Sequence, residues 1–170
     1  MENNQIIIET KFVDGPVPAA TNQQSHHDIG ARCIFLGQTR SEKHTTFGQL
    51  QYLSYEVYEE MAILELNRLV QKAIAQFGCI LVRVLHSKGV VKVGQSSVLI
   101  EVATGHRDES FQACRFLIDQ LKHQLPIWKR EFWEQGQTYV KGCCVHQPED
   151  RILGAPQISL RDEIESKKRP

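Results

Sequence analysis

The sequence predicts one domain of the α+β class, with a strand-rich order and two inserted helices. Apolar and polar residues alternate in several short segments, whereas two longer segments carry apolar residues with helical spacing. The order of these segments lacks a regular βαβ repeat, which argues against the α/β class. A chain of 170 residues can bury about 70% of its open-chain surface, so a real core is feasible.

The first third of the chain predicts three strands. Residues 5–12 form the first, and loop-forming residues follow to about residue 28. The second covers residues 30–37, which begin and end with glycine, and the third covers residues 49–57. Strict alternation gives the third strand Gln51, Leu53, Tyr55 and Val57 on one face and Leu50, Tyr52, Ser54 and Glu56 on the other.

A first helix is predicted at residues 58–77, because apolar residues recur there with helical spacing and Gly78 follows. Tyr58 and Met61, at its start, are expected in the core, where such residues are usually buried. The expected core stripe of the helix is Ala62, Leu66, Leu69, Val70, Ala73, Ile74 and Phe77.

Four more strands are predicted in the second half of the chain. Residues 79–86 and 96–103 are expected to pair through a turn-rich hairpin at 88–94. Residues 127–133 alternate again, and Gly136 is expected to mark the turn to a last strand at 138–145.

A second helix is predicted between these strand pairs. Asp108 and Glu109 mark its start, because their negative charges suit the positive end of a helix dipole. It should stop at about residue 124, because Pro126 disfavours helical geometry at the preceding residue and lacks an amide hydrogen. Its expected core stripe is Phe111, Cys114, Leu117, Ile118 and Leu121.

Residues 147–170 predict a polar tail after a domain of residues 1–146. Apolar residues become sparse there and charges of both signs alternate, with one short helix expected at 160–167. Because little apolar surface is available to order it, a solvated extension is favoured over a binding segment.

The composition argues against several functions. Lys and Arg total 20 and Asp and Glu total 20, so the cationic excess typical of nucleic-acid binding is missing. The longest apolar runs are a handful of residues, far short of the roughly 20 that span a membrane. The polar start, MENNQ, does not resemble a signal peptide.

The five cysteines favour a reducing compartment, the cytoplasm, because their number is odd and their spacing gives no disulfide framework. Cys143, Cys144 and His146 offer three metal ligands. A tetrahedral zinc site needs a fourth ligand, so we expect no metal.

Two segments predict anion sites. Gln38, Thr39 and Arg40 follow a strand that ends in glycine, where backbone amides and a guanidinium can approach an anion. His106 and Arg107 lie where a strand leads into a helix start, whose free amides attract anions. An exposed arginine in the first segment and a simple helix cap in the second are the alternatives.

Two lysines bracket the Pro126 break. Lys122 precedes it and Lys129 follows it, on the strand face opposite Arg130. A lysine with an ordinary pKa of about 10.4 is almost fully protonated at neutral pH, so burial or a second cation is needed to make it a base or nucleophile. The alternative is two surface lysines, with Lys122 paired to Asp119 on the helix.

Five ordered motifs resemble the family of large, catalytic subunits of molybdopterin synthase. The resemblance runs from about residue 5 to residue 142. The motifs are Gly30-Ala31 to Phe35 with Gly37 and Arg40; Leu53-x-Tyr55-Glu56-x-Tyr58-x-x-Met61-Ala62; His106-Arg107-x-x-x-Phe111-x-Ala113; Asp119-x-Leu121-Lys122; and Pro126-Ile127-Trp128-Lys129-x-Glu131.

The resemblance implies an α/β hammerhead-type fold, with an antiparallel sheet and two main helices. It implies a homodimer within a heterotetramer, in which each large subunit binds one small ubiquitin-like sulfur-carrier subunit. The carrier's C-terminal thiocarboxylate would supply two sulfur atoms to cyclic pyranopterin monophosphate, which becomes molybdopterin. This sulfurtransferase step of molybdenum cofactor biosynthesis would use no metal and no cofactor.

The resemblance also assigns roles to residues. Lys122 and Lys129 would be catalytic, in a pocket completed across the dimer. The implied substrate-binding residues are these two lysines together with Gln38, Thr39, Arg40, His106, Arg107, Arg130 and Glu131.

Two departures and two alternatives accompany this interpretation. Tyr139 stands where the family commonly has Trp, and Cys143 stands where some members have a basic residue. Whether Lys141 compensates for that basic residue is left open by the sequence. The alternatives are a non-catalytic scaffold for a ubiquitin-like partner and an unrelated phosphate-ester enzyme that needs no carrier.

Overall fold

The computed structural model describes residues 6–19 and 26–140 and confirms the α+β class. The elements are, in order, β1 (Ile7–Asp14), β2 (Ala31–Gln38), β3 (Lys43–His44), β4 (Gly48–Val57), α1 (Glu59–Phe77), β5 (Leu81–Lys92), β6 (Ser96–Thr104), α2 (Arg107–Gln124), β7 (Ile127–Trp133) and β8 (Gly136–Tyr139). The two-residue strand β3 was not predicted from the sequence. The predicted helix at 160–167 lies outside the described residues.

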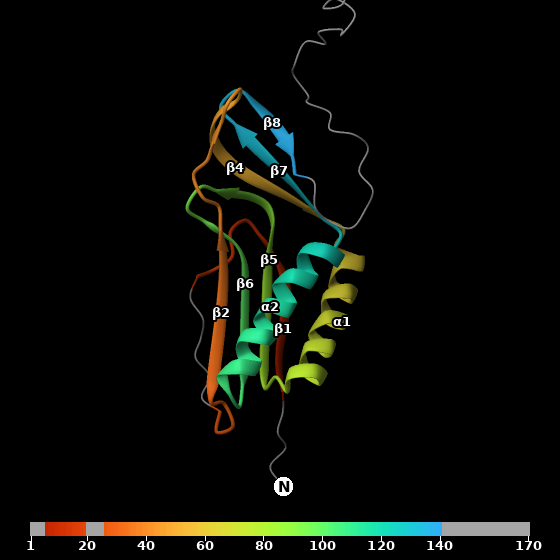
Figure 1. Ribbon diagram of the computed structural model, residues 1–170. Coiled ribbons are helices and arrows are strands. Elements are labelled where there is room, and N and C mark those ends of the chain that lie inside the picture. The colour runs from red at the N-terminus through yellow and green to blue at the C-terminus, as the bar shows by residue number, and fades with distance from the viewer. Residues whose placement is uncertain (1–5, 20–25, 141–170) are drawn as a thin grey trace, which may run out of the picture.

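The strands form one sheet that is antiparallel except for the pair β1–β5. Its hydrogen-bonded order is β2-β6-β5-β4-β7-β8, with β1 added beside β5 and β3 beside β4. Figure 1 shows α1 and α2 covering one face of the part formed by β1, β2, β5 and β6. The strands β4, β7 and β8 extend the molecule beyond the helix ends.

The core lies between the two helices and the sheet. Both helices turn most of their predicted apolar stripes inward. Helix α1 ends at Gly78, whose φ of 62° is left-handed and favours glycine. Residues of α1 and α2 that are buried there include Ala62, Leu66, Leu69, Val70, Ala73, Ala113, Cys114, Leu117, Ile118 and Leu121.

Three predictions of burial are wrong. Tyr58 and Met61 are 51% and 53% exposed, and Phe111 is 62% exposed. Phe111 borders a surface cavity together with Ile34 of β2, which is the last strand at its edge of the sheet. In the described sheet, no strand lies beyond β2 to cover that side of α2. Helical spacing alone therefore predicted too many buried residues on this helix.

The predicted hairpin link at residues 88–94 is also wrong. Strand β5 continues to Lys92, because it exchanges its partner β6 for β4 at Gly89. The turn is shorter and contains Gly94, and Gln95 donates a backbone hydrogen bond to Lys92 at 3.0 Å. This exchange of partners holds the β4–β7–β8 part against the helix-covered part.

A bulge changes the predicted alternation of β4. The register with β7 shifts between Leu50 and Tyr52, which allows Leu50 to join Leu53 in one buried cluster with Phe47 and Trp133. These two leucines were predicted to lie on opposite faces.

The last strand also begins earlier than predicted. Gly136 pairs with Trp133, so the turn consists of residues 134 and 135, and β8 ends at Tyr139. The remainder of the predicted strand, 141–145, lies outside the described residues.

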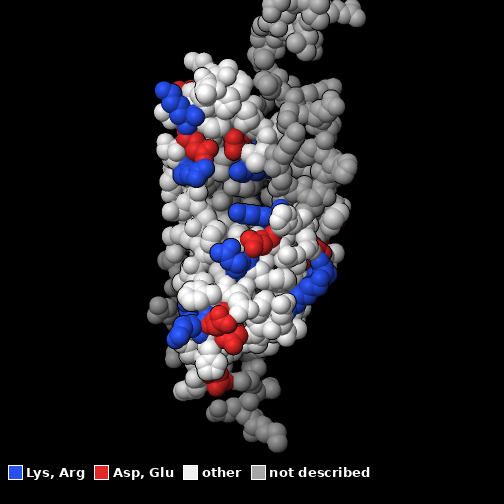
Figure 2. Space-filling model, viewed as in Figure 1, with Lys and Arg blue, Asp and Glu red and all other residues white. Residues whose placement is uncertain are grey.

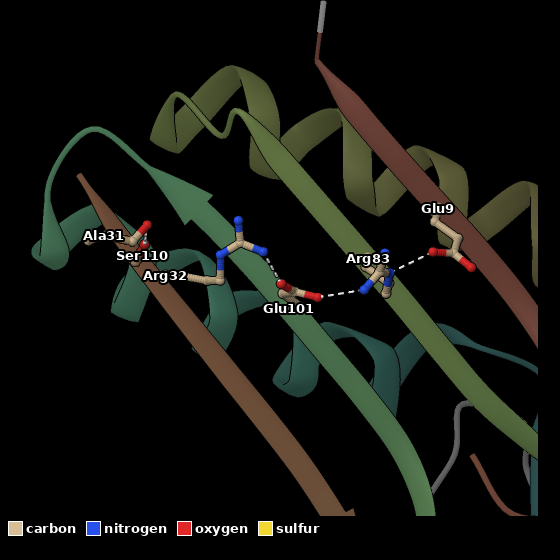
Figure 3. A network of polar contacts seen from close by, with 6 residues as sticks. All are labelled: Glu9, Ala31, Arg32, Arg83, Glu101 and Ser110. Atoms are coloured by element: carbon tan, nitrogen blue, oxygen red, sulfur yellow. Dashed lines mark hydrogen bonds and ion pairs between the residues drawn. The ribbon is translucent and has the colours of Figure 1, made fainter. Parts of the chain in front are cut away.

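A ladder of charged side chains crosses four strands on the sheet face opposite the helices (Figure 3). Glu101 of β6 is fully buried between Arg32 of β2 and Arg83 of β5, with 2.8 Å from Arg83 Nη1 to its carboxylate. Arg83 also binds the half-exposed Glu9 of β1. Two guanidinium groups therefore compensate for the desolvation of one buried carboxylate.

Replacing Glu101 by Ala is expected to lower the free energy of unfolding by about 3–5 kcal/mol, because two partly buried guanidinium groups each lose the contact with the buried carboxylate. Glu9→Ala is the matched control, since its carboxylate is 47% exposed and contacts the same Arg83, and should cost at most about 1 kcal/mol. Urea unfolding of both variants measures the difference. Equal losses would contradict a stabilising role for the buried carboxylate.

Candidate functional site

A cavity of about 520 Å³ lies where the helix-covered part of the sheet meets β4 and β7. In Figure 2, Lys and Arg side chains border a hollow at this level of the molecule. The apolar residues of its lining include Leu53 and Ile118. Six residues predicted to form the site line the cavity: Gln38, Thr39, Arg40, Lys122, Lys129 and Glu131.

The two lysines meet because the chain reverses between them. Lys122 lies in the last turn of α2. The helix stops at Leu125, whose backbone is extended because the next residue is Pro126. The chain then enters β7, where Lys129 faces the same cavity. The Pro126 break thus brings two cations, seven positions apart in the sequence, to one wall.

Alternation along β7 places Lys129 and Glu131 on one face. Their side chains are 34% and 19% exposed, and 3.7 Å separate Lys129 Nζ from Glu131 Oε1. A carboxylate at this distance can exchange a proton with the lysine through a ligand or a water molecule.

The segment after β2 is fixed by its backbone. Thr39 donates a hydrogen bond to the carbonyl of Gln95 at 2.9 Å and accepts one from Gly94 at 2.7 Å. Gly37 is required by close packing, because a Cβ atom there would lie 2.6 Å from Val98 Cγ1. Arg40 reaches outward and pairs with Glu42, so its guanidinium is at the rim of the cavity.

Three predicted site residues lie elsewhere in the same chain. His106 and Arg107 are exposed at the start of α2, and Lys122 is fifteen positions further along this helix, a rise of about 22 Å. Arg130 lies on the other face of β7, where its guanidinium pairs with Glu56 and stacks on the ring of Tyr139 at 5.1 Å. Within one chain, the predicted anion site at His106 and Arg107 is therefore far from the one at Gln38 to Arg40.

A second cavity, of about 410 Å³, adjoins the first. Its wall includes His86, which was not predicted as a site residue. Burial lowers the pKa of this histidine to about 4, and its Nδ1 lies 2.8 Å from the carbonyl of Ser87. His86 is therefore neutral at neutral pH and adds no charge to the site.

Metal-ligand clusters and membrane-spanning helices were sought among the described residues. Among residues 6–19 and 26–140, no group of three or more His, Cys, Asp or Glu side chains is placed to hold a metal ion. The described helices are each too short or too polar to cross a membrane. Cys143, Cys144 and His146 lie outside the described residues.

Comparison with known proteins identifies the family. The family model described as MoaE protein matches residues 13–124. The chain belongs to the MoaE family. The molybdopterin synthase catalytic subunit of Pyrococcus abyssi is 32% identical over 142 residues, which cover 84% of this chain and 95% of that protein. The subunit of the same name from Dictyostelium discoideum is 38% identical over 123 residues, which cover 71% and 77%.

Solved structures of MoaE relatives share the fold. A molybdopterin synthase structure from Staphylococcus aureus gives a TM-score of 0.65 at 25% identity and covers 82% of this chain and 98% of that chain. A complex of subunits 1 and 2 of molybdopterin-converting factor from Helicobacter pylori gives 0.62 at 26% identity, with 78% and 90% covered. The family resemblance predicted from the motifs is confirmed.

The MoaE similarity extends over the whole cavity. The family model ends at residue 124, before Lys129. The match to the Pyrococcus relative, however, spans 84% of the chain and so includes Lys122 and Lys129 wherever it begins.

Proposed function

We propose that this MoaE-family chain is the catalytic subunit of a molybdopterin synthase. It would convert cyclic pyranopterin monophosphate to molybdopterin with sulfur from the C-terminal thiocarboxylate of a small ubiquitin-like carrier subunit. The observation that carries the proposal is the meeting of Lys122 and Lys129 in one cavity, beside Glu131 and the segment from Gln38 to Arg40. A reducing compartment, the cytoplasm, suits this chemistry and the free thiols of Cys33, Cys79 and Cys114.

The cavity supports distinct roles for its cations. Lys129, held 3.7 Å from Glu131, would act as general acid/base or transient nucleophile at the pterin carbon that receives sulfur. Lys122 would stabilise the carrier's acyl group and the charge that develops on it. Arg40, at the rim, would leave Glu42 to bind the phosphate, for which its guanidinium is suited.

The edge of the sheet supports a homodimer. Strand β2 is an edge strand. Its residue Ile34 and the neighbouring Phe111 of α2 are 47% and 62% exposed, and both line a cavity of about 500 Å³. An exposed edge with an apolar patch favours pairing with another chain. A second copy of this chain, related by a two-fold axis, is the partner that the family resemblance implies.

Such a dimer would complete the site. Strand β2 begins beside the start of α2, where Gly30 donates a hydrogen bond to Thr104 at 3.0 Å, and ends at the cavity. Two β2 strands placed antiparallel would bring His106 and Arg107 of the second copy toward the cavity of the first. In this arrangement Arg130 would still lie on the face of β7 that is turned away from the cavity.

Reconstitution tests the proposed function. The purified protein, mixed with thiocarboxylated carrier and cyclic pyranopterin monophosphate, is expected to form the dithiolene, which mass spectrometry detects. Carrier that ends in an ordinary carboxylate is the control and should give no product. A scaffold would bind the carrier without product, whereas an unrelated phosphate-ester enzyme would turn over the pterin without any carrier. Either outcome would overturn the proposal.

A further inference from the structure

Tyr55 lies in the wall that the two adjoining cavities share. It is a β4 residue, and the antiparallel register pairs it directly with Lys129 of β7. The residues common to both cavities are Tyr55, Ser97, Val98, Ile118, Lys122 and Lys129. The polar side chains of the shared wall are therefore the two lysines of the proposed mechanism together with Tyr55 and Ser97.

The shared wall matters because, in the proposed reaction, the carrier terminus and the pterin must meet. The larger cavity has the cationic and polar lining suited to a phosphorylated pterin. The smaller one is bordered by Leu121, Ile127 and Val140, which suit the narrow peptide segment that precedes the thiocarboxylate. If each cavity holds one substrate, the sulfur atom must pass at the shared wall, within reach of the side chains that line both.

The side chain of Tyr55 is held in a fixed position. Its hydroxyl lies beside the side chain of Ser97 on β6, whose Oγ is 3.5 Å from the carbonyl oxygen of Gly37. The ring meets the neutral ring of His86 edge-on, with 5.2 Å between centroids. A hydroxyl anchored in this way needs little reorganisation to serve a reaction.

The hydroxyl also keeps its proton. Burial raises the pKa of Tyr55 above its ordinary value of 10.0, and the negative charge of Glu131 raises it further, more than the hydrogen bond with Ser97 lowers it. At neutral pH Tyr55 is therefore a neutral hydrogen-bond donor, and it lies next to Lys129 and Glu131, whose Nζ and Oε1 atoms are 3.7 Å apart.

We propose that Tyr55 is a third functional group of this site, which donates a hydrogen bond to the acyl oxygen of the carrier terminus when water attacks the thioester that joins the carrier to the pterin, and that Ser97 positions it. In that step a bond forms between the water oxygen and the acyl carbon and the bond between the acyl carbon and sulfur breaks, so the sulfur stays on the pterin and the carrier leaves as a carboxylate. This inference rests on the proposed function. A donor aimed at an oxygen on which negative charge develops stabilises the transition state more than the bound reactants. Removing it should therefore slow transfer without weakening carrier binding.

Tyr55→Phe tests the role, because it removes the hydroxyl and keeps the ring against His86. In full-length protein with thiocarboxylated carrier, the single-turnover rate of dithiolene formation should fall by about 10²-fold, as for other positioned donors. The Kd of the carrier, measured by titration calorimetry, should change less than about 2-fold. Ser97→Ala should give a smaller loss of rate, about 10-fold, because the hydroxyl remains but is no longer held.

Tyr52→Phe is the matched control. Tyr52 is a neighbouring β4 tyrosine whose ring stacks on Phe132 at 4.5 Å, and it lines neither cavity. Its variant should transfer sulfur at the wild-type rate. Equal thermal unfolding midpoints for the tyrosine variants would show that a lost fold does not explain the result.

Two outcomes would overturn the inference and leave the proposed function standing. Tyr55→Phe could transfer sulfur at the wild-type rate, or it could lose affinity for the carrier at an unchanged rate, which would make Tyr55 a docking residue. Failure of the wild-type protein to form dithiolene at all would instead remove the proposed function. The two failures are thus distinguishable.

Discussion

Lys129→Ala is expected to reduce dithiolene formation by about 10²–10⁴-fold or more, because the variant loses the proposed acid/base group. The side chain is one-third exposed, lies 3.7 Å from Glu131 and lines both cavities. Truncation there removes a cation from the wall that the two cavities share, where the proposed function has the two substrates meet. Single-turnover sulfur transfer measures the loss, and calorimetry with the carrier should give a Kd close to that of the wild type.

Lys72→Ala is the control for the loss of a positive charge. Lys72 is exposed on α1, and it lines none of the cavities described above. Its variant should keep the wild-type rate at the same ionic strength. Full activity of Lys129→Ala would exclude the assigned role, and a lost carrier affinity would reassign Lys129 to partner binding.

Local sequence patterns predicted those elements whose form depends on near neighbours. The apolar spacing of α1 and α2 and the break at Pro126 are local, and they located the helices to within one or two residues. The exchange of partners in β5 at Gly89 depends on β4, more than thirty positions earlier. A glycine between two apolar segments therefore predicted a turn where the structure has a continuous strand.

In the site, too, some features follow from near neighbours in the sequence and others from distant strands. The family resemblance predicted one pocket for Lys122 and Lys129, and the structure brings both to one cavity because the helix ends before Pro126 and the chain reverses between them. Alternation along β7 already placed Arg130 on the opposite face, and the structure shows it bound to Glu56 there. Tyr55 was missed, because an aromatic residue in an alternating strand predicts packing. Only the sheet register reveals its pairing with Lys129.

Mixed dimers are expected to recover activity that neither parent has. Arg107 and Lys122 are about 22 Å apart along α2, so they cannot serve one cavity from one chain. In a two-fold dimer, each cavity would take Lys129 from one chain and Arg107 from the other. Arg107→Ala, at an exposed helix start, should fold normally and transfer sulfur poorly.

Co-expression of Arg107→Ala and Lys129→Ala chains with different affinity tags allows isolation of the heterodimer. One of its two cavities would contain both intact residues, and the other would lack both. The isolated heterodimer should therefore show about half of the wild-type activity, and an unsorted equal mixture about a quarter. An inactive heterodimer would place both residues in the same cavity of one chain. A fully active Arg107→Ala homodimer would remove Arg107 from the site and leave the assignment of Lys129 unaffected.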